Sequence, residues 1–100
     1  MITIKQKIIE EAADYTGVSQ KIITGRSRKR DNVMIRDAIS VALKKVCGMS
    51  DESIARSIGR DRSSVGYAQK RHARRIESSV AYRLLFEHLQ DKAAKRLEAV

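Results

Sequence analysis

Apolar residues recur every three or four positions along most of this 100-residue chain, with charged residues between them. That spacing puts apolar side chains on one face of an α-helix, as in helices that pack on a core. The pattern predicts helices over residues 4–16, 19–24, 31–46, 50–58, 61–77 and 79–99. The predicted inner residues of the first three and the last helix are Ile4, Ile8, Ile9, Ala12 and Tyr15; Ile22 and Ile23; Ile35, Ala38, Ile39, Ala42, Leu43 and Val46; and Tyr82, Leu85, Phe86, Leu89, Ala93 and Leu97. We expect an all-α fold, one compact five-to-six-helix domain over residues 1–100.

Residues that favour helix ends lie between these segments. Ser19, Ser50 and Asp61 suit N-caps, and either Asp31 or Asn32 suits the third helix. Glycines follow the predicted helices, and Gly59 in particular separates the fourth helix from the fifth by a tight turn.

The fourth and fifth predicted helices therefore form a helix-turn-helix over about residues 50–77. Their expected inner residues are Ile54, Ala55 and Ile58, then Val65, Ala68, His72 and Ile76. In this motif the second helix enters the DNA major groove. The motif predicts double-stranded DNA as the partner.

The positive charge of the chain is concentrated in two places. The net charge is +9 and the pI about 10.1, which favours a polyanionic partner but is also common in ribosomal proteins and membrane-surface helices. One cluster is the basic loop, residues 25–30, with Arg26, Arg28, Lys29 and Arg30. These four side chains suit binding to phosphates or entry into a minor groove. The alternative is a basic loop that is exposed to solvent and binds nothing.

The second cluster lies on the fifth predicted helix. The first turn, where helix-turn-helix proteins reach base edges, and the outer side just beyond it supply the predicted base-reading residues Arg60, Asp61, Arg62, Ser63, Ser64 and Tyr67. An N-cap is the alternative role for Asp61. Further along, the predicted phosphate contacts are Lys70, Arg71, Arg74 and Arg75. Gly66 costs helix stability, and either a close DNA backbone or chance explains it.

Enzymatic chemistry finds no support in the residue pattern. No nucleophile motif, paired-carboxylate site or phosphate-cradling loop is evident, so we expect no enzyme, no catalytic residue, no cofactor and no nucleotide. No metal site is expected, because no Cys, His or acidic residue lies at metal-ligand spacing from His88, and His72 lies on an inner stripe. The lone Cys47 suits a reducing cytoplasm, and no apolar run is long enough to span a membrane. We expect a cytoplasmic, nucleoid-associated protein.

Residues 59–65, GRDRSSV, resemble the G-R-D-H-[ST]-T-V signature of the C-terminal DNA-binding domain of the bacterial replication initiator DnaA. VSQKII at 18–23, SRKR at 27–30 and residues 50–59 also resemble that family in order and spacing, so the likeness covers about residues 5–76. The resemblance implies a Trp-repressor-like fold and sequence-specific duplex binding. It also implies a recognition helix in the major groove and Arg28 or Arg30 in the minor groove.

This sequence departs from the family pattern at several positions. Arg62 replaces the signature histidine, Ser63 and Ser64 replace threonines, and Ile35, Arg36 and Asp37 replace a proline and paired arginines. The family's ATPase module has no counterpart, so a stand-alone domain is expected.

The sequence therefore favours a bacterial or prophage regulator of transcription or replication that acts by occupying DNA. Three alternatives stay open: an RNA-binding or ribosome-associated protein, an accessory factor of the replication machinery, and a protein-interaction module. The stripe of the last predicted helix is expected to pack on the domain core, and a homodimer through residues 79–99 is the alternative.

Overall fold

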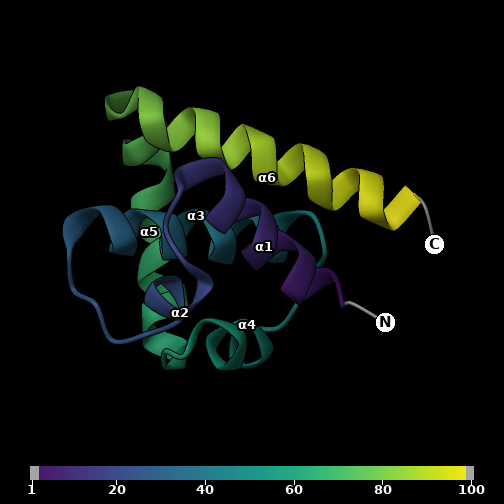
Figure 1. Cartoon of the computed structure of the whole chain (residues 1–100), viewed down its shortest axis with the longest axis horizontal. Coiled ribbons are helices and arrows are strands. Elements are labelled where there is room, and N and C mark those ends of the chain that lie inside the picture. Colours follow the sequence, from purple (N-terminus) through teal and green to yellow (C-terminus); the bar gives the residue numbers. More distant parts are fainter. Residues whose placement is uncertain (1–2, 99–100) are drawn as a thin grey trace.

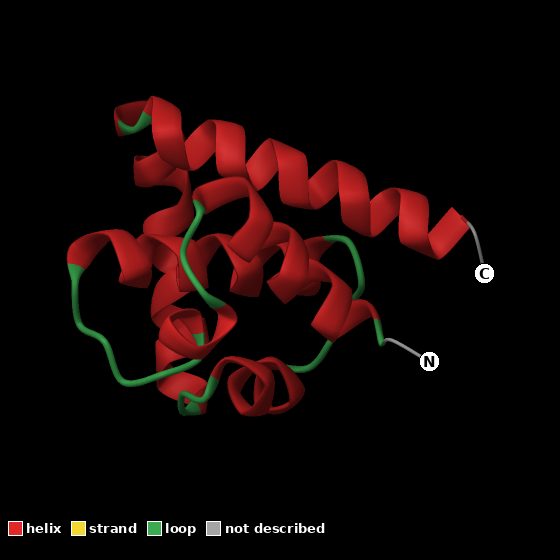
Figure 2. Cartoon of the chain, viewed as in Figure 1, coloured by secondary structure: helices red, strands yellow, loops and turns green. Residues whose placement is uncertain are grey.

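The computed structural model describes residues 3–98, and this part of the chain consists of α-helices and loops without a strand (Figure 1). The helices are α1 (Ile4–Thr16), α2 (Gln20–Ile23), α3 (Arg30–Lys45), α4 (Asp51–Ile58), α5 (Arg62–Ser78) and α6 (Val80–Glu98). The all-α prediction is confirmed. The longest connection is the loop between α2 and α3, which Figure 2 shows as an extended arm at the side of the molecule.

Helix α3 is the central element, because it contacts each of the other five helices. Ile35, Ala38, Ile39, Ala42 and Leu43 are buried, as their helical spacing predicted. Helix α6 lies across one side of the molecule and helix α4 lies at the other, with α3 between them (Figure 1). A helix surrounded in this way fixes the positions of its neighbours, and any polar residue in its middle has to find a partner inside the protein.

Three of the predicted N-caps are confirmed. The hydroxyl of Ser19 accepts from the amide of Ile22 at 3.2 Å, and that of Ser50 accepts from the amide of Ser53 at 3.2 Å. Asp61 accepts from the amide of Ser64 at 3.0 Å. Each cap satisfies an amide that the first helical turn leaves unpaired, so short-range sequence signals are enough to place these helix starts.

The predicted cap of the third helix is wrong. Helix α3 begins at Arg30, with Lys29 as N-cap residue and no side-chain cap, whereas Asp31 or Asn32 was expected. The reason is a contact that the local sequence does not reveal. Asn32 is buried and its amide donates to the hydroxyl of Ser27 at 2.9 Å, so it closes the basic loop from inside the first helical turn.

Three residues expected on inner faces are exposed instead. Ile22 is 47% exposed because the four-residue α2 buries a single side, which Ile23 occupies. Tyr15 is exposed at the edge of α1, where its ring stacks on His88 at 4.6 Å between centroids. Leu97 is exposed because the end of α6 extends past the other helices (Figure 1).

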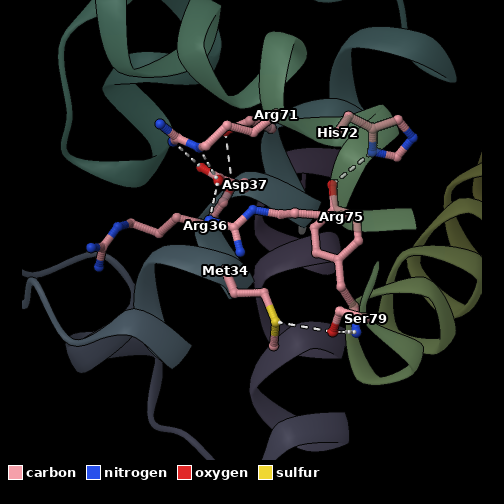
Figure 3. Close-up of polar contacts among 9 residues, drawn as sticks. Met34, Arg36, Asp37, Arg71, His72, Arg75 and Ser79 are labelled. Atoms are coloured by element: carbon pink, nitrogen blue, oxygen red, sulfur yellow. Dashed lines mark hydrogen bonds and ion pairs between the residues drawn. The ribbon is translucent and has the colours of Figure 1, made fainter. Parts of the chain in front are cut away.

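The remaining predicted residues of α6 are buried, and they carry a polar contact into the core. Tyr82, Leu85, Phe86, Leu89 and Ala93 all pack inside the chain. The hydroxyl of Tyr82 and Nδ1 of His72 on α5 share a hydrogen bond of 2.7 Å, drawn in Figure 3. Burial lowers the pKa of His72 and raises that of Tyr82, so a neutral imidazole and a neutral phenol meet there.

No helix in residues 3–98 is long and apolar enough to cross a membrane.

Candidate nucleic-acid interface

Helices α4 and α5 meet at a turn that only glycine fits. Gly59 has a φ of +67°, and a Cβ built on it would lie 2.5 Å from the carbonyl oxygen of Thr24. Real Cβ atoms essentially never come that close, and L side chains rarely adopt that φ. The turn between the two helices is therefore held directly against the residue after α2, where the basic loop starts.

The first turn of α5 carries a cluster of hydrogen bonds around Asp61. One carboxylate oxygen of Asp61 accepts from the hydroxyls of Ser63 at 2.8 Å and Ser64 at 3.1 Å, in addition to the backbone cap. These bonds lower the pKa of Asp61. The N-cap role of Asp61 is established, and both serine hydroxyls donate to its carboxylate rather than pointing away.

Arg62 and Tyr67 are the predicted base-reading residues with the most open surroundings. Both side chains are exposed, and Arg62 has no partner among residues 3–98. The Tyr67 ring lies 5.8 Å from the ammonium of Lys70, near enough for a cation–π contact. Arg60 is more enclosed, because its guanidinium donates to the carbonyls of Gly59 at 3.0 Å and Ser27 at 3.3 Å.

A groove of about 540 Å³ separates the start of α5 from the basic loop. Arg26 and Arg28 of the loop line it, together with Gly59, Arg60, Asp61 and Ser64. Three residues from the middle of the molecule, Arg36, Asp37 and Arg71, complete its polar lining. The lining contains five arginines and two aspartates, so this groove attracts anions.

The structure divides the four predicted cations of the basic loop into two pairs. Arg26 and Arg28 line the groove beside α5. Lys29 and Arg30 line a different hollow, together with Val18, Ser19 and Ile22. Of the two arginines that the family resemblance suggested for a minor groove, Arg28 is the one that shares the groove with the start of α5.

The predicted phosphate-contacting residues on α5 also differ from one another. Lys70 and Arg74 are exposed. Arg71 instead donates to both carboxylate oxygens of Asp37 at 2.9 Å, and that carboxylate raises the pKa of Arg71 (Figure 3). Arg75 lies 3.2 Å from the same carboxylate and over the ring of Tyr82. The Arg75 side chain is only 21% exposed, so it belongs to the interior of the protein.

Sequence reasoning missed the roles of Arg36 and Asp37. They occupy consecutive positions on α3, each is 4% exposed, and both border the groove. Arg36 donates to the carbonyls of Ile23, at 3.1 Å, and of Ser27. Helical spacing gave no signal for them, because both residues fall between the apolar positions Ile35 and Ala38. They do coincide with the point where the sequence departs from the family pattern.

His88 has its partners on another helix, at sequence separations that spacing does not reveal. Its Nε2 lies 3.1 Å from a carboxylate oxygen of Glu11, while its ring stacks on Tyr15, so it joins α6 to α1. Cys47 is half-buried, and burial raises the pKa of its thiol. Within residues 3–98, no three His, Cys, Asp or Glu side chains are grouped closely enough to hold a metal ion.

The arrangement of α4, the Gly59 turn and α5 defines the class: this is a helix-turn-helix protein with a cationic groove at the tip of its second helix. A comparison with protein families matches residues 5–71 to the bacterial DnaA protein helix-turn-helix. The chain belongs to this DNA-binding family. Comparisons with curated proteins and with solved structures give no match.

Proposed function

We propose that this protein binds double-stranded DNA at a preferred sequence, with the start of α5 in the major groove and the basic loop in the neighbouring minor groove. It acts by occupying its site, as a bacterial or prophage regulator of transcription or replication associated with the nucleoid. In this proposal all the described helices serve one DNA-binding domain.

The observation that carries the proposal is the groove shared by the basic loop and the start of α5. Arg26 and Arg28 line it from one side and Gly59 to Asp61 from the other, while Arg60 bonds to the loop carbonyl of Ser27. In B-DNA a single sugar-phosphate strand separates a major groove of about 12 Å from a minor groove of about 6 Å. Two cationic elements flanking one groove suit a duplex whose backbone strand lies between them.

Base reading falls first to Arg62, whose guanidinium can pair with both major-groove acceptors of guanine. Tyr67 lies five residues further along α5 and is also exposed. Arg60, Asp61, Ser63 and Ser64 complete the base-reading set. The bonds from the two serine hydroxyls to Asp61, and from Arg60 to the carbonyl of Gly59, give the tip of α5 a defined shape before DNA arrives. Because arginine stands where the family signature has histidine, the preferred sequence should differ from that of the family.

Backbone contacts fall to the remaining cations. Lys70 and Arg74 on α5, with Arg71 behind them, suit phosphates on one strand, and Arg26, Arg28, Lys29 and Arg30 suit the minor groove and its edges. Arg71 contributes through the part of its guanidinium that Asp37 leaves open, since its side chain is 40% exposed.

Selection from a pool of random-sequence duplexes tests the proposal. The purified protein should enrich one sequence motif over several rounds, and that duplex should outcompete random duplex and structured RNA. Uniform retention of all duplexes, or preference for the RNA, would replace the proposal with the RNA-binding alternative. Enrichment followed by recruitment of replication proteins to the site would favour the accessory-factor role.

A homodimer through residues 79–99 belongs to the proposal only in a restricted form. Most of the α6 stripe is buried in the same chain, and Leu97 is its exposed member. Val80 and Leu84, outside the stripe, are the other exposed large apolar residues in the described part of α6. Sedimentation across a range of concentrations, with and without the selected duplex, tests it. A constant monomer mass under both conditions would exclude the dimer.

A further inference from the structure

The two consecutive buried charges of α3, Arg36 and Asp37, have partners in different elements. Arg36 reaches the chain around the basic loop, and Asp37 reaches α5. Both partners belong to the two elements that the proposed function places on DNA. The positions of Arg36 and Asp37 therefore determine how the basic loop lies relative to α5, the recognition helix.

Arg36 holds the loop at two points. One guanidinium nitrogen donates to the carbonyl of Ile23, at the end of α2, and the other donates to the carbonyl of Ser27 in the middle of the loop. Arg60 donates to that same Ser27 carbonyl at 3.3 Å. The single carbonyl between Arg26 and Arg28 thus accepts from α3 and from the turn before α5, so the loop is anchored where its two groove-lining arginines begin.

Asp37 holds α5 at two points, through Arg71 and Arg75. Its carboxylate accepts both hydrogen bonds of a bidentate pair with Arg71, which fixes direction as well as distance. The Asp37 side chain is 6% exposed, so water does little to weaken these contacts. Figure 3 shows Arg71 and Arg75 approaching Asp37 from the same helix.

Stability alone does not explain a buried arginine at this position. Desolvating a charged group is expensive, and replacement of buried charges by apolar residues of similar volume is often neutral or stabilising. What an apolar residue cannot supply is a fork of donors that fixes two backbone carbonyls. A role in positioning the loop therefore explains why an arginine is buried at position 36, where the stability of the core does not require a charge.

We propose that Arg36 and Asp37 are positioning residues that hold the basic loop at a set distance from the recognition helix, so that both enter DNA as one preorganised unit. The inference rests on the proposed function for its DNA consequence. A loop that is already ordered does not have to lose conformational freedom on binding. The loop therefore acts as a fixed second reading element, in contrast to a flexible basic arm.

The first test needs no DNA. Arg36→Met keeps an unbranched apolar side chain in the core and removes the hydrogen bonds to the carbonyls of Ile23 and Ser27. Backbone ¹⁵N relaxation of residues 25–29 should show a clear drop in order in this variant, while α5 stays ordered. Arg36→Lys, which keeps the charge and hydrogen-bond donors but lacks the planar fork of the guanidinium, should show a smaller drop. Unchanged order of the loop in both variants would overturn the proposal.

The second test uses the selected duplex and a loop variant in which Arg26 and Arg28 are both alanine. Arg36→Met should weaken binding to the selected duplex about tenfold and leave binding to random duplex unchanged. A loss of about tenfold is near the lower end of the effect of losing one base contact in a groove. In the loop variant the same substitution should have no further effect, because the side chains it positions are gone. Full additivity of the two losses would show that Arg36 does not act through the loop.

Lys45→Met on the same helix is the matched control, since Lys45 is exposed and distant in sequence from the loop. It should leave both loop order and the ratio of selected to random binding unchanged. If the wild-type protein selects no duplex, the proposed function fails while the relaxation experiment still decides whether Arg36 anchors the loop.

Discussion

The outer and inner faces of α5 use the same residue types in opposite ways. On the outer face the side chains of Arg62 and Arg74 are exposed and have no partner among residues 3–98. On the side toward α3, Arg71 and Arg75 share one buried carboxylate, that of Asp37. The comparison teaches that charge alone does not mark a DNA contact: a cation already paired inside the protein contributes mainly to structure.

Of the substitutions considered, loss of Asp37, which faces the inner side of α5, should have the largest effect. Asp37→Ala leaves Arg71 and Arg75 facing each other without a counter-charge, and we expect the free energy of unfolding to fall by about 2–4 kcal/mol, slightly below the usual cost of breaking a fully buried pair because both arginines are partly exposed. Urea denaturation at pH 7 measures it. Asp91→Ala, which breaks the exposed pair with Lys95, should change stability by no more than about 0.5 kcal/mol. Equal effects would erase the distinction between the faces.

Arg62→Ala should instead leave stability unchanged and alter sequence preference. We expect a loss of about 1–3 kcal/mol of discrimination at one base pair of the selected site. Arg74→Ala, on the same outer face, should weaken all duplexes alike and reduce the salt slope by about one. Binding to single-base variants of the selected duplex at several salt concentrations separates the two patterns. Identical behaviour of both variants would contradict the assignment of Arg62 to bases.

Gly66 sharpens the comparison, because the outer face keeps a residue that weakens the helix. A Cβ built there meets nothing within 4 Å in the described structure, so the fold itself does not require glycine. Gly66→Ala should therefore raise stability by about 1 kcal/mol. If a sugar-phosphate strand passes close to Gly66, the same substitution should weaken DNA binding. A variant that is more stable and binds as well as the wild type would make this glycine incidental.

The inner face should show the smallest effect, as a pH dependence from His72. Burial lowers its pKa below 6.5, so the unfolded chain binds the proton more readily than the folded one. Stability is then complete above about pH 6.5 and falls on acidification, by at most about 1.4 kcal/mol per pH unit. Denaturation between pH 5.5 and 7.5 should show this slope, and His72→Gln should flatten it. The lowered pKa values of Glu11 and Asp61 act at lower pH, outside this window.

The parts of this fold that depend on neighbours in sequence were predictable. Ser50, Gly59 and Asp61 act within three or four residues of themselves, so their cap and turn roles follow from local patterns. The start of α3 was not predictable, because the Asn32 side chain donates a hydrogen bond to Ser27 and does not cap the helix. Ser27 is a loop residue whose position depends on tertiary structure.

The same distinction applies to the interface. The sequence located both cationic clusters. The exposed position of Arg74 follows from helical spacing, whereas Arg62 was singled out by its place in the first turn of the helix. The roles of Arg36 and Asp37 depend on partners 9 to 38 residues away, such as Ser27 and Arg75. Helical spacing does not connect residues at such separations. It also gives no reason to expect that Arg28 and Arg30, in the same loop, line different hollows.

The central claim is that the basic loop and the tip of α5 contact two adjacent grooves of one duplex. Dimethyl sulfate tests it directly, because it methylates guanine N7 in the major groove and adenine N3 in the minor groove. On the selected duplex the protein should protect a guanine N7 and, about half a helical turn (5 base pairs) away, an adenine N3. Arg62→Ala should lose the first protection and Arg28→Ala the second. Protection confined to one groove, or loss of both protections with either variant, would contradict the account.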